Sequence, residues 1–195
     1  MPSAALQAIP PHRTGFTDLD LLEPLCQFYP GPSVDLGQRQ VPGACLPEPY
    51  RRLLVHDSDM TSTLQAFHGE RLGLRVLDHY TSGGSLFRQV ALFGVDSGKR
   101  VEYGAIRIEL SFFEPAARER IVSGWQPLGA ILAEFQVPYL SRPRRFFEIK
   151  ADDFVRGALE LDEPAVLYGR QNHLLAASGL PLAEVVEILP PTAPH

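Results

Sequence analysis

Residues 72–112 read LGLRVLDHYTSGGSLFRQVALFGVDSGKRVEYGAIRIELSF, and they carry the clearest strand pattern of the chain. Two glycine-containing turns, Ser82-Gly83-Gly84 and Asp96-Ser97-Gly98, divide it into apolar segments. Short apolar runs separated by such turns predict consecutive antiparallel strands. The expected strands are 72–80, 86–95 and 101–112.

Helical spacing and further strand-like runs surround this meander. Met60, Leu64 and Phe67 recur at the spacing of one helix face, with Asp57 or Ser58 placed to cap that helix and Gly69 placed to end it. Residues 115–136 predict two short helices divided at Gly124. The remaining predicted strands are 145–150, 165–176 and 182–189. Strands joined by short turns, with a minority of helices, predict an α+β fold in which helices cover one side of an antiparallel sheet of about six strands.

Composition indicates how the chain is divided and which classes of protein it does not resemble. Nine of the 18 prolines lie in the first 50 residues, which predicts a Pro-rich arm over 1–49 and a domain over 50–195. The net charge of −5 argues against a general nucleic-acid surface. No apolar run approaches the roughly 20 residues of a membrane span, and no secretory signal is visible, so we expect a cytoplasmic protein without membrane or nucleic-acid partners.

Two charged residues interrupt otherwise apolar strand faces. Arg88 shares its face with Leu86, Val90 and Leu92, and Glu187 shares its face with Ala183, Val185 and Leu189. A buried guanidinium needs an anion, and a buried carboxylate needs a cation, a donor or a proton. The two side chains therefore pair with each other, extend to solvent at the rim of the sheet, or contact a bound ligand.

Two further arginines, Arg107 and Arg170, lie in strand-like segments with apolar neighbours. Each is a candidate for a second anionic group of a ligand, although an exposed face is the alternative for at least one of them. No histidine or cysteine spacing typical of a metal site is present, and no phosphate loop or dinucleotide fingerprint occurs. We therefore expect neither a metal nor an organic cofactor.

Five ordered segments resemble the chorismate pyruvate-lyase family over residues 50–191. They are Leu53-Leu54-Val55-His56-Asp57-Ser58-Asp59-Met60-Thr61, Phe87-Arg88-Gln89-Val90-Ala91-Leu92, Pro127-Leu128-Gly129-Ala130-Ile131-Leu132, Leu167-Tyr168-Gly169-Arg170, and Gly179-Leu180-Pro181-Leu182 leading to Glu187. The resemblance implies a six-stranded antiparallel sheet with a helical flap over a buried pocket. It also implies cofactor-free elimination of pyruvate from chorismate, giving a hydroxybenzoate such as the ubiquinone precursor 4-hydroxybenzoate.

The same resemblance implies roles for individual residues. Arg88 would hold the ring carboxylate and Glu187 would act as the acid–base group, so both are catalytic candidates. Met60 and the backbone of Leu128 and Gly129 would line the pocket. Glu187 aligns with the acid of the family only if the alignment shifts by one residue after Gly179. Glu184 is the other nearby acid, but it lies on the opposite strand face.

The sequence is also similar to the ligand-sensing domains of GntR-type transcription regulators. The segment Asp57-Ser58-Asp59-Met60-Thr61, the strand arginine Arg88 and Gly179-Leu180-Pro181-Leu182 carry this likeness. The alternative function is therefore a non-catalytic sensor of an aromatic or sugar acid. The Pro-rich arm is too short and too poor in basic residues for a winged helix, so we expect a free-standing domain, monomeric or homodimeric, with a small carboxylate as partner.

Overall fold

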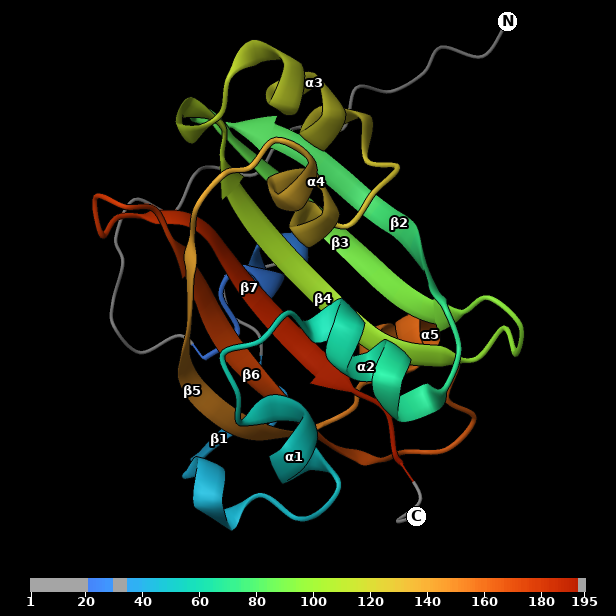
Figure 1. Ribbon diagram of the computed structural model, residues 1–195. Helices are drawn as coiled ribbons and strands as arrows, with labels where there is room; N and C mark the ends of the chain where they lie inside the picture. The colour runs from blue at the N-terminus through green and yellow to red at the C-terminus, as the bar shows by residue number, and fades with distance from the viewer. Residues whose placement is uncertain (1–20, 30–34, 193–195) are drawn as a thin grey trace, which may run out of the picture.

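A single antiparallel sheet of seven strands forms the centre of the computed structural model, which describes residues 21–29 and 35–192 (Figure 1). The strand order across the sheet is β1-β5-β6-β7-β4-β3-β2. The strands are β1 (Arg39–Val41), β2 (Leu72–Ser82), β3 (Ser85–Gly94), β4 (Arg100–Glu109), β5 (Leu140–Lys150), β6 (Val166–Leu175) and β7 (Pro181–Leu189). The α+β prediction is confirmed. The seventh strand, β1, comes from the Pro-rich arm and is a short edge strand, where proline is tolerated.

The predicted meander forms β2, β3 and β4. Gly83 and Gly84 connect β2 to β3, with φ of 58° and 85°. A two-residue hairpin turn of this kind needs positive φ at both positions, which glycine adopts without steric cost. The register places Arg88 opposite Ile106, and the next strand in the sheet, β7, places Glu187 opposite Gly104.

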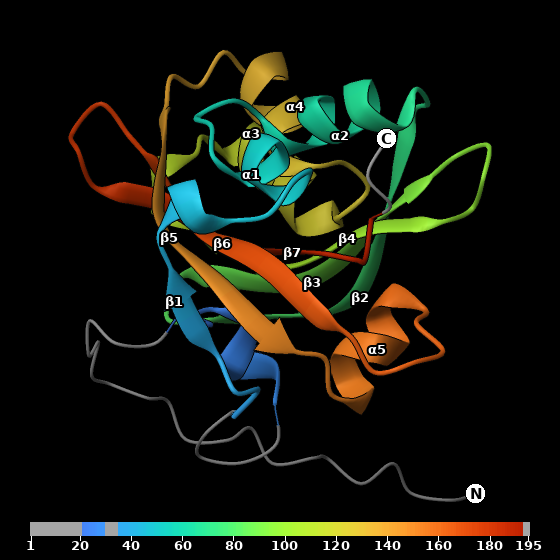
Figure 2. The same cartoon turned by 90° about the horizontal axis from the view of Figure 1, so that it is seen from below.

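Helices cover both faces of the sheet unequally. The α-helices are α1 (Tyr50–Leu54), α2 (Met60–His68), α3 (Pro115–Ser123), α4 (Leu128–Glu134) and α5 (Asp153–Leu159), and the 3-10 helices are η1 (Leu25–Phe28), η2 (Gly43–Cys45) and η3 (Leu110–Phe112). Helices α1 to α4 lie on one side of the sheet, while α5 lies on the other (Figure 2). We call the side under α1 to α4 the front face and the other side the back face.

Local signals explain where α2 begins and ends. Asp59 caps the helix, because its side chain accepts a hydrogen bond of 2.8 Å from the backbone N–H of Ser62. The cap therefore lies one or two residues after the predicted Ser58 or Asp57. Gly69 ends the helix in the left-handed conformation, with φ of 69°.

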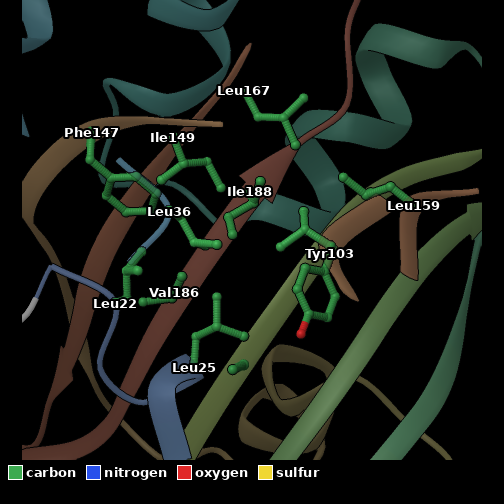
Figure 3. Packing of buried hydrophobic residues seen from close by; sticks show 12 residues of the cluster. Leu22, Leu25, Leu36, Tyr103, Phe147, Ile149, Leu159, Leu167, Val186 and Ile188 are labelled. Atoms are coloured by element: carbon green, nitrogen blue, oxygen red, sulfur yellow. The ribbon is translucent and has the colours of Figure 1, made fainter. Parts of the chain in front are cut away.

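An apolar core lies on the back face (Figure 3). Tyr103, Val186 and Ile188 of the central strands are buried there, with Phe147 of β5. Leu22 and Leu25 from the Pro-rich arm are also fully buried in this cluster, so the described part of the arm contributes to the core. The division into an arm of 1–49 and a domain of 50–195 stays a prediction.

The front face combines apolar and polar regions. One apolar cluster lies under α3 and α4 and includes Ile106, Ile121 and Ile131, and another lies under α1 and α2 and includes Leu54 and Leu64. Charged side chains occupy the sheet surface between these clusters. Among the described residues, no helix is long and apolar enough to cross a membrane.

Candidate functional site

A cavity separates the two apolar clusters of the front face. Its floor is formed by β3, β4, β6 and β7, and its roof by the first residues of α2 and α4 together with Tyr139. The empty space measures about 730 Å³, including the part that opens to solvent. The charged and polar residues that line it are Ser58, Asp59, Thr61, Arg88, Glu102, Tyr139, Ser141, Arg170, Asn172 and Glu187.

Strand alternation explains why these charges share one surface. Val90, Gly104, Glu187 and Arg170 are cross-strand neighbours in one row across the sheet. Gly104 lowers the floor in that row, because a Cβ there would lie 3.2 Å from Glu102 Oε1 and 3.0 Å from the carbonyl oxygen of Val186. A larger residue at this position would crowd the carboxylate and fill the cavity floor.

Arg170 and Glu187 form an ion pair at one end of the floor. Arg170 is fully buried, and its Nε donates to Oε2 of Glu187. Its Nη1 donates to the carbonyl oxygens of Leu54 at 3.1 Å and His56 at 2.9 Å. These bonds satisfy carbonyls at the end of α1 and attach the α1–α2 connection to the sheet. Burial and the nearby Arg170 guanidinium lower the pKa of His56.

Arg88 lies at the other end and has a different environment. It is 3% exposed, and its Nε and Nη1 have no hydrogen-bond partner among the described residues. Burial lowers the pKa of the Arg88 guanidinium to about 10, so it is still cationic at neutral pH. A buried cation without an anion is costly, and a ligand anion would remove that cost.

Glu102 is a buried ionisable side chain that the sequence interpretation missed. It is 5% exposed, and its Oε2 has no hydrogen-bond partner among the described residues. Burial, followed by the nearby carboxylate of Glu187, raises the pKa of Glu102 well above its ordinary value. Its strand face also holds Gly104, Ile106 and Ile108, so the apolar-face criterion that selects Arg88 would also have selected Glu102.

The first residues of α2 and α4 form the roof of the cavity. Met60, Leu128 and Gly129 all line the cavity. Gly129 allows α4 to approach the start of α2, because a Cβ there would lie 2.8 Å from Oδ1 of Asp59. A side chain at Gly129 would displace the Asp59 carboxylate, which caps α2.

Six of the seven sequence-predicted site residues line this cavity, and Arg107 does not. Arg107 lies on the back side of β4, where its Nη1 is 3.5 Å from Oε2 of Glu184. Glu184 also faces His173 there, at 3.9 Å. Glu187 is therefore the acid of β7 that reaches the cavity. Among the described residues, no three His, Cys, Asp or Glu side chains are grouped so that they could hold a metal ion.

Arg88 and Glu187 do not form the pair that the strand pattern allowed. Glu187 is bound to Arg170, its direct cross-strand neighbour, whereas Arg88 lies on β3 in a different row. The guanidinium of Arg88 therefore faces the cavity without this counterion.

No sequence family matches the chain. A comparison with curated proteins likewise finds no match. Solved structures do resemble it. PhnF from Mycobacterium smegmatis superposes with a TM-score of 0.56 at 11% identity, covering 69% of this chain and 64% of PhnF. The effector domain of PhnF gives a TM-score of 0.57 at 12% identity, covering 70% of this chain and 90% of that domain.

A third solved structure names the type of protein. It is the ligand-binding domain of a Bordetella bronchiseptica protein assigned to the GntR family of transcriptional regulators, with a TM-score of 0.51 at 12% identity, covering 64% of this chain and 88% of that domain. The chain has the fold of these effector domains. At such low identity the likeness establishes the fold alone, and this chain spans about 64% of the length of full PhnF.

These structures overturn the chorismate pyruvate-lyase interpretation. The similar folds belong to ligand-binding and effector domains, so the predicted lyase activity, with chorismate as substrate, a hydroxybenzoate as product and a place in ubiquinone synthesis, is wrong. The site geometry gives a physical reason. Glu187, the expected acid–base group, is engaged by the guanidinium of Arg170 and is therefore part of the framework.

Proposed function

We propose that this chain is a non-catalytic sensing domain that binds a small organic anion in the front-face cavity. The observation that carries the proposal is Arg88, a buried guanidinium that lines the cavity without an anion from the described protein residues. A planar guanidinium is suited to a carboxylate or phosphate, which it binds through paired hydrogen bonds. The shared fold with ligand-binding domains of regulators supports the same function.

The other buried arginine does not compete for this role. Arg170 already donates to Glu187 and to two backbone carbonyls, so its hydrogen-bonding groups serve the fold. The proposal therefore assigns the anionic group of the ligand to the β3 end of the cavity. In this proposal the protein acts in the cytoplasm, with a small carboxylate or phosphate ester as its partner.

Thermal unfolding with a panel of carboxylates, phosphate esters and sulfonates tests the proposal. A ligand present at about 100 times its dissociation constant stabilises the folded state by about 2.7 kcal/mol, which is a readily measured rise in Tm. We expect at least one anion to raise the Tm and to be recovered unchanged after incubation. Arg88→Met should abolish the rise.

The matched control is Arg107→Met, because Arg107 lies on β4 outside the cavity. The control variant should respond to the anion as the unmodified protein does. An anion response that survives in Arg88→Met, or a panel in which no anion binds, would contradict the proposed function.

A further inference from the structure

The two edges of the sheet differ in the features that prevent pairing with another chain. At one edge, β1 has three residues, and the part of β5 beyond it contains Arg142, Pro143 and Arg144. Short edge strands, charged residues and proline all prevent an edge from pairing with another strand. At the other edge, β2 has eleven residues and contains no proline. The β2 edge is therefore the one suited to pairing.

A bulge in the middle of β2 determines which of its residues share a face. Val76 pairs with Val90 and Asp78 pairs with Gln89, so Leu77 is an extra residue between them. In a regular strand, residues three positions apart lie on opposite faces. The extra residue reverses this relation, so residues three positions apart across the bulge lie on the same face.

Arg75 and Asp78 therefore both lie on the back face. Ala91, the neighbour of Arg75 on β3, pairs with Tyr103 of the back-face core. Gln89, the neighbour of Asp78, accepts a hydrogen bond of 3.1 Å from the hydroxyl group of Tyr103. Both charged residues are exposed. The outer edge of the sheet thus presents one cation and one anion on the same face, one on each side of the bulge.

We propose that β2 pairs with β2 of a second copy of this chain, antiparallel about a two-fold axis that passes between Val76 and Leu77. This axis places Arg75 of each copy opposite Asp78 of the other, so two ion pairs form on the back face. Val76 of each copy lies opposite Leu77 of the other. One continuous sheet then runs through the dimer, and the two cavities lie on the same side of it.

The faces of β2 specify this register, because a shift by one residue would place a front-face residue opposite a back-face residue. In the proposed register Leu74 lies opposite His79. Both are front-face residues, since their neighbours on β3, Leu92 and Arg88, line the cavity. The alternation that sets the face also sets which backbone N–H and C=O groups point away from β3. The same register therefore brings the outward backbone groups of the two copies together.

Exposed apolar side chains lie near the proposed axis. Leu77 is 40% exposed, and Trp125, in the connection between α3 and α4, is 86% exposed. This connection lies against β2 (Figure 1), because a Cβ on Gly124 would be 3.5 Å from Cγ2 of Val76. Tryptophan is enriched in the centres of protein interfaces. Pairing about this axis would remove apolar surface from water in addition to forming the strand ladder.

Sedimentation velocity of the full chain over a series of concentrations tests the proposal. We expect a monomer–dimer equilibrium in the micromolar range, because the edge of one strand is a small interface. Arg75→Asp should weaken dimerisation by about tenfold or more. In a two-fold interface each substitution acts twice, so this variant places like charges opposite each other at two positions.

Reversal of both charges separates this register from a general effect of surface charge. Asp78→Arg should weaken dimerisation by a factor similar to that of Arg75→Asp. The double variant Arg75→Asp with Asp78→Arg should dimerise as the unmodified protein does, because it restores opposite charges at both positions. Arg144→Asp, at the other edge of the sheet, is the matched control and should leave dimerisation unchanged.

Trp125 gives a second measurement of the same equilibrium, because it is the only tryptophan of the chain. Its fluorescence emission should shift to longer wavelength on dilution. A chain that stays monomeric at millimolar concentration would overturn the proposal. A dimer that neither single variant weakens would also overturn it, and so would one that both weaken but the double variant does not restore.

Discussion

A buried arginine lies at each end of the cavity floor, and the two differ in their hydrogen-bond partners. On β6, Arg170 is fully buried and bonded to Glu187, Leu54 and His56. On β3, Arg88 is equally buried, and its Nε and Nη1 have no partner among the described residues. The difference shows that burial alone does not reveal what a charged residue does. Arg170 holds the fold together, and Arg88 is the residue to which we assign the anionic group of the ligand.

Replacement of Arg170 should cause the largest loss of stability. Arg170→Met leaves Glu187 buried without its cation and releases two backbone carbonyls of the α1–α2 connection. Breaking a buried pair in this way typically costs about 3–5 kcal/mol of unfolding free energy. Urea denaturation of the variant and of the unmodified protein measures this loss. The double variant Arg170→Met with Glu187→Leu should recover part of the loss, because no unpaired charge remains. A single variant as stable as the unmodified protein would remove the distinction between the two arginines.

Replacement of Arg88 should instead raise the free energy of unfolding. Arg88→Met replaces a buried, unpaired cation with an apolar side chain of similar length, so the free energy of unfolding without ligand should rise by about 1–3 kcal/mol. The same urea denaturation checks it, with Arg107→Met as control. A clear loss of stability would show that Arg88 has a structural role like that of Arg170.

The pH dependence of stability should reveal Glu102. Its folded-state pKa is raised, so above the ordinary value of 4.5 the folded protein holds a proton that the unfolded chain has lost. Stability from this group is therefore complete below that value and falls as pH rises towards the folded-state pKa. Glu102→Gln should remove this fall, and its advantage over the unmodified protein should grow by at most about 1.4 kcal/mol per pH unit. Parallel stability profiles for the two proteins between pH 4 and 8 would contradict the raised pKa.

The smallest effect should come from an ion pair outside the cavity. Nη2 of Arg39, on β1, lies 3.1 Å from Oε2 of Glu148 at the surface, and 67% of the Arg39 side chain is exposed. Arg39→Ala should cost less than about 1 kcal/mol, because solvent screens such pairs. A loss as large as that of Arg170→Met would mean that exposure does not separate the two kinds of ion pair in this protein.

Individual elements show how far local sequence patterns reach. The glycine turn at 83–84, the helix that ends at Gly69 and the strand faces of Arg88 and Glu187 follow from residue spacing. The choice of Arg170 as partner of Glu187 does not follow, because it depends on β6 lying beside β7. Glu102 could have been found from its strand face. The position of Arg107 outside the cavity could not be predicted. The alternation of side chains along a strand does not say which face of the sheet each helix covers.

Local alternation and turn chemistry specify the antiparallel meander, the α+β class and the buried position of several ionisable residues, so these could be predicted from the sequence. Which of these residues neutralise one another depends on which strands lie side by side. Strand order places Arg170 against Glu187 and leaves Arg88 and Glu102 facing one cavity, which local periodicity cannot specify. For the same reason the five short motifs suggested an enzyme, whereas the arrangement of their side chains led us to propose a binding domain.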